Sequence, residues 1–396
     1  MRARSIARQA MGMLTLLCVL ASALGLSTLR ALAQGEIATK AHQAVLMDAE
    51  SGGILFQRNG NDMMYPASMS KLMLLAVVFK AMRKGEVKED QLFLMTESAT
   101  RRGGAAAGAS AMQVPPGTRL PLDELIKGIV VQSGNDAAIC IAENMSGTEA
   151  NFAKRMTEEA RAIGLRKSVF RNATGLFQAE HQMTAKELAV LARHLIRTYP
   201  EHYALFAMRD YTWRKTRFVN RNPLLGLVPG ADGLKTGHLK EAGYGLVGSA
   251  LQDGRRLIVV VNGLATMEER RDEARKLLEW GFRSFTEARL FEADDEIGRL
   301  RVWGADRLTV PVKGPGEITL LVPRAAGGQR FTGRIYYTGP LKPPLKRGDQ
   351  IAVLRVTSAQ DASLEVPLHV AEDVGPGPLW WRGLDSLLHL ATRWVP

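Results

Sequence analysis

The run Pro66-Ala-Ser-Met-Ser-Lys71 stands directly before a series of apolar residues at helical spacing. The spacing predicts a helix over residues 68–82, with a serine and a lysine one turn apart on the same face near its start. The free N–H groups and positive dipole end of a helix N-terminus stabilise negative charge that develops on an oxygen. A lysine crowded there can lose its proton and accept one from a serine hydroxyl. Ser68 and Lys71 are therefore a candidate nucleophile and its base, although a helix N-cap followed by a surface lysine would have the same spacing.

Two further polar motifs follow along the chain. Ser133-Gly-Asn135 precedes a predicted helix over residues 137–145, and a loop hydroxyl and amide there can relay a proton and hold a substrate carbonyl. Lys235-Thr-Gly237 lies on a predicted strand, where a lysine and a threonine suit recognition of a carboxylate and a glycine lets a substrate backbone approach closely. A helix-capping turn would explain the first motif by itself, but ordinary structure does not explain the order and separation of all three.

The apolar periodicity places strands at both ends of a helical region. Strands are predicted over residues 44–48, 54–56, 244–248 and 256–261, and helices over residues 122–131, 137–145, 149–163, 184–198 and 267–282. We expect an antiparallel sheet made from the two ends of this region, with helices around it, as one domain over residues 34–284.

The pattern changes near residue 285 to short alternating strands separated by Gly, Pro, Lys and Asp. These strands are predicted over residues 308–312, 318–322, 334–337, 351–356 and 363–366. They indicate a small all-β sandwich over residues 285–375, with the acidic run Glu292–Glu296 as the hinge before it.

The N-terminus has the pattern of a secretory signal peptide over residues 1–33. Three arginines precede an apolar stretch over residues 11–26, and Ala31-Leu-Ala33 forms a small-residue cleavage site. An uncleaved anchor helix is the alternative. Cleavage would remove four arginines and no acidic residue, so the formal net charge of +12 would become +8. It would also leave Cys140 as the only cysteine, which we interpret as a small buried apolar residue.

The composition excludes several classes of protein. No internal segment approaches 18 uncharged apolar residues, no His-Glu-x-x-His pair or phosphate-binding loop occurs, and two cysteines are too few for a disulfide scaffold. Basic residues are not interleaved with aromatic ones, so we expect no nucleic-acid partner despite the positive charge. A negatively charged wall polymer or membrane surface suits that charge better.

The C-terminal residues 376–396 have the pattern of an amphipathic helix. Apolar side chains at helical spacing share one side, namely Trp380, Leu384, Leu387, Leu388, Ala391 and Trp394. The segment is too short and too polar to span a bilayer, so we expect it to lie at a membrane surface. A helix packed on the preceding β domain is the alternative.

Together the three motifs resemble the signature of the penicillin-recognising serine acyl enzymes, which is Ser-x-x-Lys, Ser-x-Asn and Lys-Thr-Gly. Within that superfamily the chain is similar to the exported D-alanyl-D-alanine carboxypeptidases, the low-molecular-mass penicillin-binding proteins of the peptidase S11 family. Other family-like stretches are Asn172-Ala-Thr-Gly-Leu176, Asn220-Arg-Asn222, Asp232-Gly-Leu-Lys-Thr-Gly-His238 and Pro344-Leu-Lys-Arg-Gly-Asp349. The resemblance implies an α+β fold, with a β-lactamase/transpeptidase-like catalytic domain (an antiparallel sheet with helices), then the small all-β sandwich and the C-terminal amphipathic helix.

The resemblance also implies a role for each matching residue. Ser68 would be the nucleophile, Lys71 the base that activates it, and Ser133 the group that passes the proton to the leaving D-alanine. The substrate-binding residues would be Asn135, Lys235, Thr236, Gly237, His238 and Arg221.

Within that binding set, Lys235 and Thr236 would hold the terminal carboxylate, and Asn135 would position the substrate. The backbone N–H groups of Ser68 and His238 would form the oxyanion hole. Arg221 would support the carboxylate end of the site, or form a surface ion pair instead.

The resemblance implies peptidoglycan stem peptides ending in D-Ala-D-Ala as substrates, β-lactams as inhibitors, and no cofactor or metal. It also implies an exported protein at the periplasmic face of the cytoplasmic membrane. Two departures from the family pattern concern substrate detail: Leu239 stands where relatives commonly carry threonine, and an arginine that some relatives have near Leu264 is absent.

Three alternatives share parts of this pattern. A class A β-lactamase needs a carboxylate base between the second and third motifs, and the corresponding residues 161–179 contain no Asp or Glu. An endopeptidase that cleaves cross-links would use the same machinery. A non-enzymatic wall-binding scaffold would have a decayed site, whereas here all three motifs are intact.

Overall fold

The structure is a computed structural model that describes residues 37–324, 331–358, 363–380 and 382. The predicted signal peptide and most of the predicted C-terminal helix lie outside these residues. Within the described part of the chain, no helix is both long enough and apolar enough to cross a membrane.

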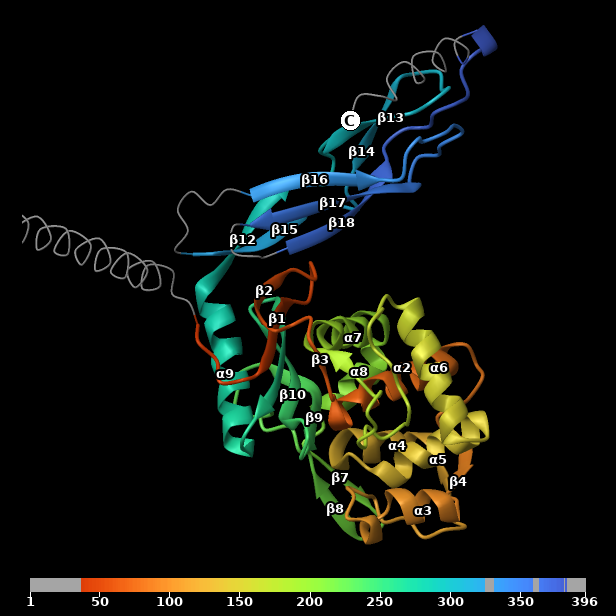
Figure 1. Cartoon of the computed structure of the whole chain (residues 1–396), viewed down its shortest axis with the longest axis vertical. Helices are drawn as coiled ribbons and strands as arrows, with labels where there is room; N and C mark the ends of the chain where they lie inside the picture. Colours follow the sequence, from red (N-terminus) through yellow and green to blue (C-terminus); the bar gives the residue numbers. More distant parts are fainter. Residues whose placement is uncertain (1–36, 325–330, 359–362, 381, 383–396) are drawn as a thin grey trace, which may run out of the picture. The chain divides into compact units, whose positions relative to one another are not determined.

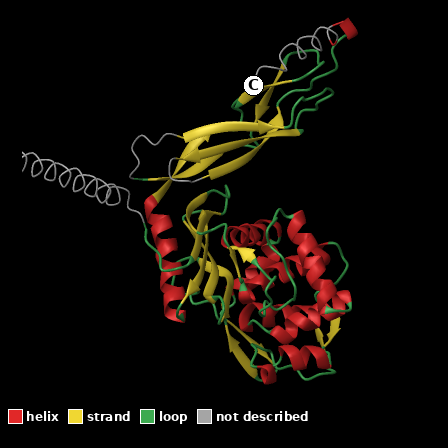
Figure 2. Ribbon diagram, viewed as in Figure 1, coloured by secondary structure: helices red, strands yellow, loops and turns green. Residues whose placement is uncertain are grey.

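The catalytic region is built on a five-stranded antiparallel sheet whose strands come from its two ends, as the sequence predicts (Figure 2). The strand order is β2-β1-β11-β10-β9, so β9, which carries the third motif, lies at an edge. The strands are β1 Gln43–Asp48, β2 Ile54–Arg58, β9 Ala231–Leu239, β10 Gly243–Gln252 and β11 Arg255–Leu264.

Helices cover both faces of this sheet. α9 lies along one face, while α2 and α7 lie on the opposite side (Figure 1). Alternate strand residues explain the two layers: Val45 and Met47 belong to the core shared with α2, whereas Leu46 faces Gly281 of α9. The helices are α2 Lys71–Arg83, α3 Glu97–Gly103, α4 Leu122–Lys127, α5 Asn135–Ser146, α6 Glu149–Ala162, α7 Ala185–Thr198, α8 Pro200–Tyr203 and α9 Met267–Ser284.

Threonines define where four of these helices begin. The side chains of Thr96, Thr148, Thr184 and Thr266 each accept the backbone N–H three residues further on, which satisfies one of the unpaired donors of the first turn.

Short elements connect the main ones. The helical turns are η1 Ala67–Ser70, η2 Ala105–Ala107, the π-helical η3 Gly128–Gln132 and η4 Ala204–Ala207. The two-stranded pairs are β3 Met63–Met64 with β6 Met183–Thr184, β4 Leu92–Leu94 with β5 Arg119–Pro121, and β7 Asp210–Trp213 with β8 Thr216–Val219.

The second region is all β, as predicted, with its own apolar core. Its strands are β12 Phe285–Phe291, β13 Gly298–Arg301, β14 Thr309–Lys313, β15 Ile318–Pro323, β16 Phe331–Tyr337, β17 Gln350–Ser358 and β18 Ser363–Val370. They form a sheet of order β13-β14-β18-β17-β16 and the pair β12-β15. The predicted hinge at Glu292–Glu296 is wrong, because β12 begins directly after α9 and the acidic run therefore connects two strands inside this region.

Candidate active site

Ser68 lies in the short turn η1, and α2 begins only at Lys71. The turn is held by a hydrogen bond in which Ser70 Oγ donates to the carbonyl oxygen of Ala67 at 3.0 Å. The structure therefore divides the single predicted helix over residues 68–82 into a tight turn that presents the serine and a regular helix that buries the lysine. Ser68 is partly exposed, whereas the Lys71 side chain is fully buried.

Three oxygen atoms surround the Lys71 ammonium nitrogen. Lys71 Nζ lies 2.9 Å from Ser68 Oγ, 2.6 Å from Asn135 Oδ1 and 2.6 Å from the carbonyl oxygen of Thr174. Burial, together with the positive charge of Arg221, lowers the pKa of Lys71 to about 7, while Asp136 opposes the shift. A lysine in this state can exist as a neutral amine near neutral pH and accept the proton of Ser68.

The second motif follows the π-helical turn η3 and adjoins the same lysine. Ser133 has a left-handed backbone with φ 63°, and its hydroxyl has no hydrogen-bond partner among the described residues. The buried carboxylate of Asp136 anchors this corner by accepting the backbone N–H groups of Met112 and Gln113 at 2.9 Å each. Asn135 is thereby fixed at the start of α5, with its Oδ1 on Lys71.

The third motif occupies the edge strand β9, directly beside the nucleophile turn. A Cβ atom added to Gly237 would lie 2.9 Å from the carbonyl oxygen of Pro66, so the close approach of strand and turn requires glycine here. Lys235 and Thr236 are buried, and Lys235 Nζ donates to the Thr236 carbonyl oxygen at 3.3 Å. The exposed His238 ring stacks on Tyr244, with ring centroids 4.0 Å apart.

The carboxylate end of the site gathers positive charge. Burial holds the pKa of Lys235 well below its usual value, and the charges of Lys71, Arg221 and Arg270 lower it further. Among the described residues no carboxylate forms an ion pair with Lys235. A buried cation without a counter-ion is suited to receiving the carboxylate of a ligand.

Arg221 binds neutral partners in place of the surface ion pair considered from the sequence. Its Nη1 donates to Ser110 Oγ at 2.7 Å, and its Nε donates to Gln132 Oε1 at 3.4 Å. Gln132 precedes Ser133, so the guanidinium braces the loop that carries the second motif.

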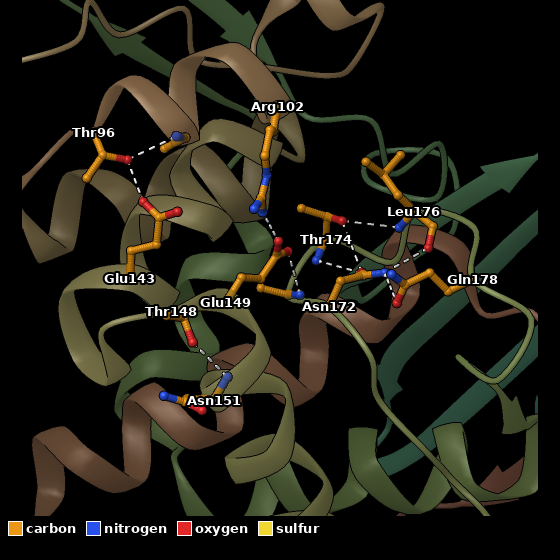
Figure 3. Close-up of polar contacts among 12 residues, drawn as sticks. Thr96, Arg102, Glu143, Thr148, Glu149, Asn151, Asn172, Thr174, Leu176 and Gln178 are labelled. Carbon is orange, nitrogen blue, oxygen red and sulfur yellow. Dashed lines mark hydrogen bonds and ion pairs between the residues drawn. The ribbon is translucent and has the colours of Figure 1, made fainter.

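The loop after α6 supplies a contact that the sequence motifs did not identify, namely the Thr174 carbonyl on Lys71. Asn172 shapes this loop because its Oδ1 accepts the backbone N–H groups of Thr174 and Gly175, at 3.2 and 2.7 Å (Figure 3). Glu149 secures its start by accepting the N–H of Ala173 at 2.9 Å. The stretch Asn172-Ala-Thr-Gly-Leu176 resembles the family, but the sequence could not predict this contact because every residue type has a backbone carbonyl.

This loop also bears on the β-lactamase alternative. Thr174 offers Lys71 a neutral carbonyl rather than a carboxylate. Glu149, whose side chain contacts the loop, pairs with Arg102 and accepts the N–H of Ala173 (Figure 3). Glu180 pairs with Arg171. Among the described residues, neither carboxylate contacts the Ser68–Lys71 pair, and the oxygen partners of Lys71 Nζ come from Ser68, Asn135 and Thr174.

The fold and this site define a serine acyl enzyme of the penicillin-recognising class. A family model described as D-alanyl-D-alanine carboxypeptidase matches residues 30–266, and one described as the C-terminal domain of penicillin-binding protein 5 matches residues 285–376. The chain belongs to this peptidase S11 family and is a D-alanyl-D-alanine carboxypeptidase, a hydrolase. The alternative of a non-enzymatic scaffold is therefore wrong.

Individual relatives agree over most of the chain. D-alanyl-D-alanine carboxypeptidase DacC of Escherichia coli is 34% identical over 88% of this chain and 88% of its own length. DacA of Haemophilus influenzae is 33% identical over 87% of this chain and 88% of its own length. The crystal structure of penicillin-binding protein 5 from Haemophilus influenzae covers 86% of this chain and 99% of its own, with 33% identity and a TM-score of 0.73. Penicillin-binding protein D2 of Listeria monocytogenes, solved with ampicillin bound, covers 63% of this chain and all of its own, with 30% identity and a TM-score of 0.56.

Proposed function

We propose that the enzyme removes the terminal D-alanine from peptidoglycan stem peptides through an ester on Ser68. The observation that carries this proposal is the 2.9 Å contact between Ser68 Oγ and a buried Lys71 whose pKa is lowered to about 7. Lys71 Nζ takes the hydroxyl proton as Oγ attacks the carbonyl carbon of the penultimate D-alanine. The backbone N–H groups of Ser68 and His238 receive the oxyanion.

Collapse of the tetrahedral intermediate breaks the peptide bond to the terminal D-alanine. Its amine leaves with a proton passed from Lys71 through the Ser133 hydroxyl, which has no partner among the described residues and so is available for this relay. Water then attacks the ester and regenerates Ser68. Lys235 and Thr236 hold the substrate's terminal carboxylate, and Asn135 positions the peptide.

We expect β-lactams to form an ester on the same serine, Ser68, and this ester to be hydrolysed slowly. A β-lactam acylates Ser68 when Oγ opens its four-membered ring, which keeps the leaving nitrogen attached to the product. The absence of Asp and Glu from residues 161–179 supports a long-lived adduct, because no carboxylate of this segment can activate the deacylating water.

The test of this function compares Ser68→Ala with Ser98→Ala, which removes the hydroxyl of a half-buried serine on α3, outside the site. Release of D-alanine from a synthetic peptide ending in D-Ala-D-Ala and labelling by a fluorescent penicillin are both measured. We expect both activities to vanish in Ser68→Ala and to persist in Ser98→Ala, with mass spectrometry placing the wild-type adduct on the peptide containing Ser68. Penicillin labelling that persists in Ser68→Ala would contradict Ser68 as the nucleophile.

We infer further that the chain is exported and acts at the periplasmic face of the cytoplasmic membrane. The signal-peptide pattern of residues 1–33 supports export, and the amphipathic pattern of residues 376–396 supports attachment to the membrane surface. N-terminal sequencing of the exported protein should begin at Gln34. A mature chain that retains residues 1–33 would instead favour the uncleaved anchor.

A further inference from the structure

Near the end of the β9–β10 hairpin, two opposed glycines form the face of the sheet that meets the turn carrying Ser68. Gly237 of β9 stands opposite Gly245 of β10 in the register. A Cβ atom on Gly237 would lie 2.9 Å from the Pro66 carbonyl oxygen, and one on Gly245 would lie 2.5 Å from Met69 Cε. The two opposed glycines let the hairpin pack closely on the turn that carries Ser68, so no side chain of this pair can hold the hairpin from that face.

The next pair in the register supports the hairpin from the other face. His238 stands opposite Tyr244, and successive strand residues point to opposite faces of a sheet. Their rings stack with centroids 4.0 Å apart and an interplanar angle of 23°. His238 is the residue whose backbone N–H is assigned to the oxyanion hole, so this stack bears directly on the position of that donor.

Arg270 of α9 lies near the same ring. Its guanidinium carbon lies 5.7 Å from the centre of the Tyr244 ring. The side chain is only 7% exposed, and its Nε has no hydrogen-bond partner among the described residues. In that same part of the chain no carboxylate forms an ion pair with Arg270, so the ring face of Tyr244 is the interaction that the structure gives this buried cation.

We propose that Arg270 is a positioning residue that acts through Tyr244 on His238 and so sets the oxyanion-hole N–H relative to Ser68. This inference rests on the proposed function, because it assigns a purpose to that donor. α9 thus contributes to the site from the side of the sheet remote from α2 (Figure 1). Arginine suits this position because a planar guanidinium can lie against the face of an aromatic ring, which an ammonium group cannot do in the same way.

The test uses the full-length protein with four variants. Arg270→Met removes the guanidinium, Arg270→Lys keeps the charge without the planar face, Tyr244→Leu removes the ring, and a double variant joins the first and third. Arg271→Met, on the next residue of α9, is the control, since the Arg271 side chain is 42% exposed and pairs with Asp272. The readouts are kcat and KM for a D-Ala-D-Ala peptide, the acylation rate with penicillin, and the melting temperature.

We expect kcat and the acylation rate to fall about tenfold in Arg270→Met, Arg270→Lys and Tyr244→Leu, with KM within twofold of wild type, because a misplaced donor weakens only the transition state. In the double variant, kcat and the acylation rate should fall no further than in the more impaired of the two single variants. If Arg270→Met fails to fold, Arg270→Lys and Tyr244→Leu still carry the test.

Several outcomes would overturn the proposal. Wild-type rates in Arg270→Lys would mean that charge alone suffices, and additive losses in the double variant would mean that the two side chains act independently. A rise in KM confined to peptides with a free terminal carboxylate, and missing for their methyl esters, would make Arg270 a carboxylate ligand. Failure of the proposed function is recognised separately, because wild-type protein would then not be labelled by penicillin on Ser68.

Discussion

Lys71 shows how burial can turn an ordinary residue into a base. Its ammonium group has three oxygen neighbours, two of them from Asn135 and Thr174, and none of the three belongs to a carboxylate. A buried lysine without a paired anion is less costly to keep neutral than charged. The sequence could place Lys71 near Ser68 by spacing, but the size of the pKa shift depends on the burial that the whole domain imposes.

The pH dependence of acylation follows from this shift. Because the pKa of Lys71 is lowered to about 7, the base form is present above pH 7 and is lost below it. We expect the second-order rate of acylation by penicillin to fall about tenfold per pH unit below 7 and to level off above it. Lys71→Arg, which stays protonated, should show no such pH dependence and should remain about 10²–10⁴-fold below the wild-type rate at pH 8. A flat profile between pH 5 and 9 would contradict Lys71 as the base.

Cys140 provides a second prediction at the scale of one residue. The thiol is fully buried on α5 and donates to the Leu94 carbonyl oxygen at 3.3 Å. Burial, with the charges of Glu143 and Asp136, raises its pKa to about 12, so the reactive thiolate is scarce. We expect thiol reagents to leave the native enzyme unlabelled and active, and to label Cys140 stoichiometrically only after unfolding. Rapid labelling of the native protein, with loss of activity, would favour a link from Cys140 to the Ser133 loop instead.

At the scale of elements, the loop that presents Thr174 depends on a glycine. Gly175 has φ +80°, and a Cβ atom there would lie 2.0 Å from the Ala67 carbonyl oxygen. We expect Gly175→Ala to cost about 1–2 kcal/mol for its left-handed backbone and about 1–3 kcal/mol more for the clash, and to impair acylation. Gly117→Ala is the matched control, with φ +81° and no atom within 4 Å.

Chemical unfolding and penicillin labelling of the two variants measure this difference. Gly117→Ala should lose stability alone, because it shares the backbone penalty but lies in open space. Equal stability and equal acylation in both variants would show that the loop can move away from the nucleophile turn without consequence.

The longer elements could be predicted from the sequence because each has a clear apolar period. Predicted residues 149–163 became α6 Glu149–Ala162, and predicted residues 256–261 lie within β11 Arg255–Leu264. The short hairpin β7–β8 was not predicted, since two four-residue strands carry too little periodicity. The sequence predicts the π-helical turn before Ser133 as ordinary helix, because the two differ in their backbone hydrogen bonds and a run of apolar residues does not distinguish them.

The contacts of the active site likewise fall into those that the sequence could predict and those that it could not. Motif spacing identified the side chains that meet at Lys71, namely Ser68 and Asn135. It could not identify the Thr174 carbonyl, which any residue would supply, or the neutral partners of Arg221. Contacts made by backbone atoms, and contacts between remote loops, depend on the packed structure and not on residue type.

At the scale of the whole molecule, the proposed attachment to a membrane depends on residues 376–396. Leu379 and Trp380, the first large apolar side chains of this segment, are 82% and 73% exposed. Each fully buried large apolar side chain contributes about 1.5–3 kcal/mol. Half-burial of five of them in the interface therefore amounts to several kcal/mol, enough for reversible attachment. Two arginines and one aspartate on the polar side contribute little net charge, so salt should have little effect.

Truncation after Gly377 should therefore yield a soluble enzyme with full activity, while the full-length protein stays with membranes in high salt. Leu387→Asp, on the apolar side of the predicted helix, should release the full-length protein because burying a carboxylate in the interface is costly. Ser386→Asp, on the polar side, is the matched control and should remain bound. Co-sedimentation with vesicles and D-alanine release are measured for all four proteins. A truncated protein that still sediments with membranes, or equal release by the two aspartate variants, would place the membrane contact elsewhere in the chain.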